Sequence, residues 1–209
     1  MPEHFIVNDN MIEPPASPED ADKVEVLRGP NIKPFPKTEK LPEEITAKAV
    51  LKVGDNITTD HIMPAGAKIL PYRSNIPHLS QYCFAVCDET FPERIKAEGK
   101  GFIIGGANYG QGSSREHAPI AIKAAGVSCV IAETFARIFY RNAINIGLPI
   151  IECPEAAKAI NAGDEVTVDF DSGIITDETT GEKFKGQAFP PFMQKIIDCE
   201  GLVNYINQK

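Results

Sequence analysis

The glycine-rich stretch at residues 105–117, Gly-Gly-Ala-Asn-Tyr-Gly-Gln-Gly-Ser-Ser-Arg-Glu-His, limits the folds open to this chain more than any other feature. It follows the apolar run Phe102-Ile-Ile104 and precedes a helical pattern. A strand that enters a glycine-rich loop and then a helix is typical of parallel α/β sheets, where free N–H groups at the helix start can bind an anion. We therefore expect an α/β fold with an anion site at this loop.

The flanking residues give the pattern of a layered α/β domain. Short apolar runs predict buried strands over residues 46–53, 101–106, 127–132 and 148–152. Helices are predicted over residues 93–98, 114–125 and 134–146, each followed by a glycine that can take the left-handed conformation at a helix end. A hairpin is predicted over 165–176 and a closing amphipathic helix over 191–207.

Prolines set the beginning of the chain apart from the rest. Eight of the 17 prolines fall between Pro2 and Pro42, where helix interiors are therefore excluded. We expect residues 1–44 to form an extended N-terminal arm or interdomain linker that lies on another surface. Residues 45–209 are expected to form the compact domain.

Composition narrows the classes of function. Hydrophobic residues make up 43% of the chain, but no apolar run approaches the ~20 residues that span a bilayer, and the first residues lack a signal-peptide pattern. The formal charge of −8 disfavours nucleic acid and anionic membranes as partners, so positive groups for an anionic substrate must be local. Five cysteines without a paired metal-binding spacing predict reduced thiols, a cytoplasmic location and no metal bound by this chain.

Ser113 has two interpretations. Ser113 and Glu116 match a capping box, in which the serine would only cap the following helix. Alternatively, Ser113 and Ser114 belong to a carboxylate or oxyanion site, in which the guanidinium of Arg115 binds a carboxylate through two N–H groups. A capping box requires neither the four glycines before Ser113 nor Arg115. We therefore favour the interpretation of Ser113 and Ser114 as part of a carboxylate or oxyanion site. His117 is expected to be structural and to bond a neighbouring loop.

A second segment carries polar residues in a loop, at 54–66. Asp60 and His61 stand side by side, which suggests a charge partner for an arginine, although Thr58 to Asp60 could equally cap a short helix. Arg73 is a candidate second anion ligand, with an exposed surface arginine as the alternative.

These residues carry a family resemblance. Residues 55–66, 108–118 and 135–138 together resemble the C-terminal swivelling domain of aconitases, to which the small subunit of isopropylmalate dehydratase is closely related. By motif, the resemblance covers about residues 50–148. It implies a layered β/β/α swivelling domain with a mostly parallel central sheet plus a hairpin.

The resemblance implies a role for each matching residue. It points to the C-terminal half-site of an aconitate hydratase of the tricarboxylic acid cycle, which converts citrate to isocitrate through cis-aconitate. The implied roles are catalytic base for Ser113, binding of substrate carboxylates for Ser114, Arg115 and Arg73, and orientation of the site for Asp60 and His61.

The resemblance also implies a 4Fe-4S cluster in the complete enzyme. We expect it on the remaining aconitase domains or on a large subunit, with none bound by this chain, which alone should be inactive. The proline-rich arm favours a fragment of a longer aconitase. However, Met63 stands where mitochondrial aconitases have serine, and Met63-Pro64-Ala65 leans toward the isopropylmalate enzymes. The alternatives are therefore a small subunit of 3-isopropylmalate dehydratase and, in another class, a carboxylate-sensing or RNA-binding regulatory module.

Overall fold

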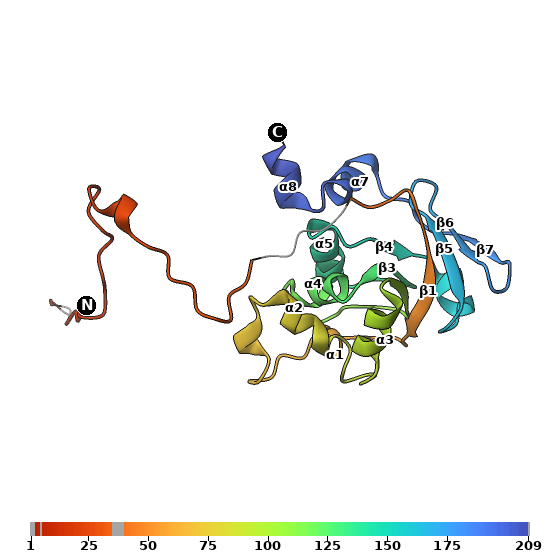
Figure 1. Cartoon of the computed structure of the whole chain (residues 1–209), viewed down its shortest axis with the longest axis horizontal. Coiled ribbons are helices and arrows are strands. Elements are labelled where there is room, and N and C mark those ends of the chain that lie inside the picture. Colours follow the sequence, from red (N-terminus) through yellow and green to blue (C-terminus); the bar gives the residue numbers. More distant parts are fainter. Residues whose placement is uncertain (1–2, 5, 35–39, 209) are drawn as a thin grey trace. The chain divides into compact units, whose positions relative to one another are not determined.

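The computed structural model describes residues 3–4, 6–34 and 40–208 (Figure 1). The chain divides into two units, residues 1–30 and 31–209. In the first, the described side chains are exposed, and the regular structure among them is one 3-10 turn, Ala21–Lys23. Of the predicted arm, residues 1–2, 5 and 35–39 lie outside the described residues.

One mixed sheet runs through the second unit (Figure 1). Its strands are β1 (Glu44–Lys52), β2 (Gly101–Gly105), β3 (Val127–Ala132), β4 (Ile150–Glu152), β5 (Glu165–Asp169), β6 (Ile174–Asp177) and β7 (Lys183–Lys185), in the spatial order β4-β3-β2-β1-β5-β6-β7. Strands β1 to β4 pair in parallel, whereas β5, β6 and β7 continue from β1 as antiparallel neighbours. The predicted α/β class, a parallel sheet with a hairpin, is confirmed. The antiparallel part is larger than predicted, because β7 extends the hairpin.

Helices cover the sheet. They are α1 (Thr59–Ile62), α2 (Ile76–Leu79), α3 (Phe91–Glu98), α4 (His117–Ala124), α5 (Arg137–Asn145), α6 (Pro154–Ala159), α7 (Pro191–Asp198) and α8 (Leu202–Asn207), with 3-10 turns η2 (Leu70–Tyr72) and η3 (Ser80–Tyr82). Sequence analysis missed α6. No helix in the described part of the chain is both long and apolar enough to cross a membrane.

Strand β2 is apolar throughout because it faces two cores. Ile103 points into a cluster with residues of α1 to α5, whereas Phe102 and Ile104 point into a second cluster with α6, β5 and β6. Successive side chains of a strand alternate between the faces, so a sheet covered on both sides has no polar positions. This explains why β2 is buried at every residue.

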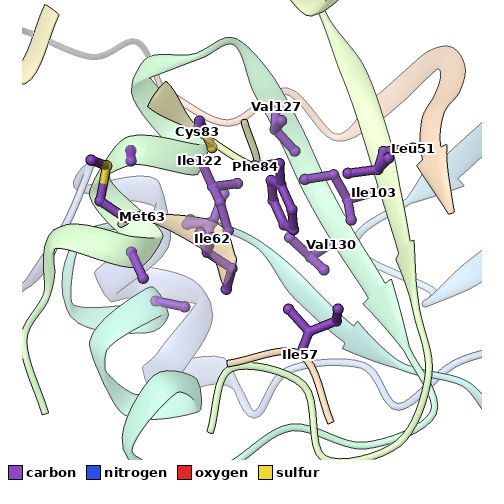
Figure 2. Packing of buried hydrophobic residues seen from close by; sticks show 14 of the residues in the cluster. Leu51, Ile57, Ile62, Met63, Cys83, Phe84, Ile103, Ile122, Val127 and Val130 are labelled. Atoms are coloured by element: carbon purple, nitrogen blue, oxygen red, sulfur yellow. The ribbon is translucent and has the colours of Figure 1, made fainter. Parts of the chain in front are cut away.

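The first core is built around Phe84. Figure 2 shows its ring beside Ile122, Val127 and Val130. Phe84 is fully buried and has a φ of 56°. Its N–H donates to the carbonyl of Ile62 at 2.8 Å, which ties the segment after η3 to α1. The core therefore fixes the short helices that precede the parallel strands.

The predicted helix over 191–207 is wrong as one element. It divides into α7 and α8 at Glu200 and Gly201, whose φ values are 63° and 126°. A Cβ on Gly147 would lie 2.9 Å from the carbonyl carbon of Glu200, so the break presses against the end of α5. Lys123 also lies at the end of α5, where its Nζ donates to the carbonyl of Ile146 at 2.9 Å.

Lys123 gives a pH-dependent prediction. Burial lowers the pKa of Lys123 from 10.5 to about 8. Between these values the unfolded chain binds more protons than the folded chain, so the free energy of unfolding should rise with pH in this window. We expect Lys123→Met to remove a rise of roughly 1 kcal/mol between about pH 8 and pH 10. Urea denaturation of both chains across this range measures it, and parallel curves would contradict it.

Candidate active site

The loops that follow β1, β2 and β3 meet at one edge of the sheet. They comprise residues 53–58, 106–116 and 133–136. The carboxyl ends of parallel strands lie at the same edge, which is where α/β sheets form their sites. Backbone hydrogen bonds of 2.7 to 2.9 Å join these loops, from Asn56 to Ala107, from Tyr109 to Thr134 and from Gly110 to Ile57.

Glycines in the second loop are required by contacts within the chain. A Cβ on Gly106 would lie 2.2 Å from a carboxylate oxygen of Asp55. A Cβ on Gly110 would lie 2.2 Å from the Phe139 ring, and Gly110 also has a φ of 83°. The sequence predicted an anion site at this glycine-rich loop. The observed role of these glycines is to let three loops and α5 come together, which then places Ser113.

Ser113 does not cap α4, so the capping-box interpretation is wrong. The helix begins at His117, and the preceding Glu116 makes no side-chain cap. Instead, the Ser113 N–H donates to the hydroxyl of Thr59 at 3.0 Å. The Ser113 hydroxyl oxygen accepts from the Nε–H of Arg115 at 2.9 Å and from the Arg115 backbone N–H at 3.3 Å.

The contact between Arg115 and Ser113 brings a positive charge to the hydroxyl oxygen. A guanidinium N–H aimed at a hydroxyl oxygen stabilises the deprotonated form more than the neutral form. Arg115 is held in turn by Asp60, whose Oδ1 lies 4.0 Å from its Nη2. The predicted pairing of Asp60 with an arginine is therefore present. Both side chains are largely exposed, so the ion pair itself adds little stability.

A pocket gathers four of the six predicted site residues. Asp60, Arg73, Ser113 and Arg115 line it together. The apolar side chains that also line it, here called the apolar wall, are Met63, Pro64, Ala65, Ile69, Leu70, Leu79 and Ala118. The enclosed space is about 20 Å³, enough for one water and too small for a dicarboxylate. A further surface must complete the pocket before it can enclose such a substrate.

Ser114 and His61 do not reach this pocket. Ser114 is exposed, and its carbonyl accepts from the side-chain amide of Asn142 at 3.0 Å. His61 is exposed and forms a capping box for α1: its N–H donates to the Thr58 hydroxyl at 3.0 Å, and its Nδ1 accepts from the Thr58 N–H at 3.1 Å. The prediction that this segment caps a short helix is confirmed. The substrate-binding and orienting roles of Ser114 and His61 stay predictions.

Two further residues belong to the pocket, Thr59 and His117. Thr59 is buried, and its hydroxyl holds the backbone of Ser113. The sequence offers two adjacent threonines and no signal for which one turns inward. His117 is half-buried and lines the pocket together with Arg73, whose backbone acts on its ring. Burial is the largest cause that lowers the pKa of His117, and the positive charge of Arg115 is the second largest.

The described residues do not fit an iron–sulfur cluster. Among them, no group of three His, Cys, Asp or Glu side chains is placed to hold a metal ion. The thiols are free, and those of Cys83, Cys129 and Cys153 are buried. A cluster is held by several cysteine thiolates that converge on the iron atoms.

The fold thus places a pocket lined by two arginines and an apolar wall at the carboxyl edge of the parallel strands of a layered α/β domain. Residues 42–156 match the family model described as the aconitase C-terminal domain. The chain belongs to this family.

Its relatives include separate subunits. The chain is 58% identical over 160 residues to the 3-isopropylmalate dehydratase small subunit of Lachnoclostridium phytofermentans, which covers 77% of this chain and 94% of that protein. It is 58% identical over 159 residues to the 2,3-dimethylmalate dehydratase small subunit of Eubacterium barkeri, covering 76% and 94% respectively. A crystal structure of 3-isopropylmalate dehydratase from Methanocaldococcus jannaschii has 38% identity and a TM-score of 0.72, over 79% of this chain and 94% of that chain.

These relatives correct one expectation. The predicted half-site of an aconitate hydratase, with its place in the tricarboxylic acid cycle, is wrong, because relatives at up to 58% identity are small subunits of dehydratases for alkyl-substituted malates. They favour the alternative, the small subunit of 3-isopropylmalate dehydratase. Met63, which departs from the sequence pattern of mitochondrial aconitases, is buried and lines the pocket. The broader assignment to the aconitase-related hydro-lyases holds.

The glycine loop gives a stability prediction. Gly110→Ala should destabilise the chain by about 3 kcal/mol or more, because the new methyl group overlaps the Phe139 ring and φ is positive. Gly181→Ala is the matched control: its φ is 80°, but nothing lies within 4 Å, so only a backbone cost of about 1 kcal/mol is expected. Denaturant unfolding of both variants measures the difference, and equal losses would rule out the overlap.

Proposed function

We propose that this chain is the small subunit of a hydro-lyase that dehydrates and rehydrates an alkyl-substituted malate such as 3-isopropylmalate. The observation that carries the proposal is the Ser113 hydroxyl, which accepts two hydrogen bonds from Arg115 and lines the same pocket as the apolar wall. A basic oxygen, carboxylate-binding arginines and an alkyl-binding surface are the three groups that this reaction requires.

In this proposal Ser113 accepts the proton that leaves the substrate carbon. Before the transfer the serine would be an alkoxide, whose negative charge Arg115 stabilises and which free serine cannot carry near neutral pH. Accepting the proton returns Ser113 to the neutral hydroxyl. Arg115 and Arg73 also supply the remaining N–H groups for the two carboxylates of the malate, since a guanidinium matches a carboxylate in a fork. Asp60 orients Arg115, and Thr59 fixes the backbone of Ser113.

The apolar wall favours an alkyl substituent over a third carboxylate. Met63 is only 6% exposed and lines the pocket beside Leu79, which is 2% exposed. A carboxylate against this surface would lose its water without gaining a hydrogen bond, whereas an isopropyl group would bury apolar surface. The relatives that act on isopropylmalate and dimethylmalate support the same substrate class.

A cluster-bearing large subunit would complete the enzyme. The described residues do not fit a 4Fe-4S cluster, so we assign it to that partner, where its iron would polarise the substrate hydroxyl as a Lewis acid. The small enclosed volume of the pocket is consistent with a site that closes only against the partner. We expect this chain alone to be inactive.

We further propose that residues 1–44 form an arm that docks on a surface outside the compact domain at 45–209. The family model begins at residue 42, so the arm falls outside the matched region. Its described side chains up to residue 30 are exposed, including Val26 at 76% and Leu27 at 84%. A cytoplasmic location remains our expectation, because five free thiols suit a reducing compartment.

The role of Ser113 can be tested in the enzyme assembled from this chain and a large subunit. Ser113→Ala should lower kcat for 3-isopropylmalate about 10³-fold with KM changed only a few-fold, because the proton acceptor is lost and the arginines remain. Ser114→Ala, one residue on, is the matched variant and should retain most of kcat. Steady-state kinetics decide, and wild-type turnover by Ser113→Ala would exclude Ser113 as the base.

The role of Met63 is tested by a substrate panel on the same complex. Met63→Ser should lower kcat/KM for 3-isopropylmalate about tenfold relative to the value for malate, because the isopropyl group loses its apolar contact. Met63→Leu keeps the volume and the apolar surface and should leave the ratio nearly unchanged. An unchanged ratio in Met63→Ser would contradict the assignment of this wall. Absence of turnover for every alkyl malate in the wild-type complex would contradict the proposed function itself.

A further inference from the structure

Pro119 limits where α4 can begin. It is the third residue of this helix and is buried. The first backbone hydrogen bond of α4 runs from the Ile120 N–H to the carbonyl of Glu116, the residue before the helix, at 3.1 Å. One step closer to the N-terminus, residue 119 would have to donate to the Arg115 carbonyl. Proline has no N–H, and its ring would collide with that carbonyl, so Pro119 opposes any earlier start.

The neighbouring residues favour an earlier start. Ser113 and Glu116 match a capping box, which would begin the helix at Ser114. In that helix Pro119 would lie beyond the first turn, where a proline strongly destabilises helical structure. The capping pattern and the proline thus favour different conformations of residues 113–116. The observed start at His117 is the one that the proline allows.

The later start leaves room for the contact between Ser113 and Arg115. The Ser113 hydroxyl accepts from the Arg115 Nε–H at 2.9 Å and from its backbone N–H at 3.3 Å. On a helix, residues two positions apart do not face each other. A helical path through residues 113–115 would therefore turn the guanidinium away from the hydroxyl. The contact requires the non-helical turn that the chain forms here.

Two bonds from distant elements hold this turn. The Ser113 N–H donates to the Thr59 hydroxyl at 3.0 Å, and the side-chain amide of Asn142 donates to the Ser114 carbonyl at 3.0 Å. In a helix that began at Ser114, the same carbonyl would accept from the Ala118 N–H. These bonds stabilise the turn while the proline destabilises the helix, so both act on one equilibrium between the two conformations.

We propose that Pro119 is a positioning residue for the reaction, which stops α4 at His117 and so keeps the Arg115 guanidinium on the Ser113 hydroxyl. The inference rests on the proposed function, because it takes Ser113 as the proton acceptor. Pro119 is not among the residues that line the pocket. Its replacement should let α4 extend in part of the molecules, and turnover should fall with the fraction that leaves the turn.

The first measurement is made by NMR on the chain alone. In Pro119→Ala, the backbone carbon shifts of residues 114–116 should move toward helical values, and the Ala118 N–H should gain protection from hydrogen exchange. In Pro119→Ala combined with Asn142→Ala the shifts should move further, because a bond that holds the turn is also gone. Unchanged shifts in both variants would overturn the assignment of Pro119.

The second measurement is the kinetics of the complex with the large subunit. Pro119→Ala should lower kcat for 3-isopropylmalate about three- to tenfold, because only molecules with the turn are active. Adding Glu116→Pro should restore kcat, since a proline there keeps Arg115 out of the helical region. Glu116 is exposed, and its φ of −75° is one that proline adopts.

Pro154→Ala is the matched control, because Pro154 also lies in the first turn of a helix, α6, and does not line the pocket. It should change neither kcat nor the shifts of residues 114–116. A loss of kcat in Pro119→Ala that Glu116→Pro does not reverse would contradict the positioning role, since it would reflect only lost packing at a buried side chain.

The two measurements separate this inference from the proposed function. If residues 114–116 become helical in Pro119→Ala but the wild-type complex turns over no alkyl malate, the proposed function fails while the effect of Pro119 on the turn stands. If the wild-type complex is active and Pro119→Ala keeps full kcat, the proposed function stands and the role of Pro119 in the reaction is excluded.

Discussion

The hydrogen bond from the Arg115 guanidinium to the Ser113 hydroxyl is the interaction on which the site depends. It places a permanent positive charge 2.9 Å from an oxygen that would otherwise be an ordinary alcohol. The contact joins residues only two positions apart, and it forms because the backbone between them is not helical. The loop keeps this shape because Thr59 holds it at Ser113 and Asn142 holds it at Ser114. The α/β scaffold thus determines the position of the Ser113 hydroxyl through a few hydrogen bonds to backbone atoms.

Strand β1 explains how such a loop is supported on both sides. It pairs in parallel with β2 through its last residues and antiparallel with β5 through its first residues. The parallel half delivers three loops to one edge, while the antiparallel half and α6 close the second core. The free energy of burying these two cores stabilises the sheet, so the loops themselves need only hydrogen bonds to one another. The pocket sits on the side of α1 and α4, at the surface of the first core.

Periodicity and glycine placement sufficed to predict the parallel strands, α3 and the ends of the helices. Gly99, Gly126 and Gly147 have φ values of 74°, 106° and 69°, as a left-handed helix end requires. The start of α4 was predicted three residues too early, because Ser113 and Glu116 match a capping pattern that tertiary bonds to Thr59 and Arg115 override. The sequence showed Met63 as a departure from mitochondrial aconitases. A contact of Met63 with the substrate could be proposed only after the structure had placed this residue in the apolar wall of the pocket. The places of Thr59 and His117 in the pocket depend on contacts between distant segments, which no local pattern encodes.

The division of the pocket into a polar loop and an apolar wall has a consequence for how enzymes of this kind diversify. The polar side is tightly constrained, since Gly106 and Gly110 have no space for a single added carbon. Met63, Leu70 and Leu79 belong to a different segment, although Met63 and Leu79 also pack in the first core. Under the proposed function, libraries that randomise the wall among apolar residues of similar volume should alter the substrate range and leave the Ser113 loop in place. The same division of the pocket would let related enzymes evolve to accept other hydroxy acids through changes in the wall, while the polar loop stays the same.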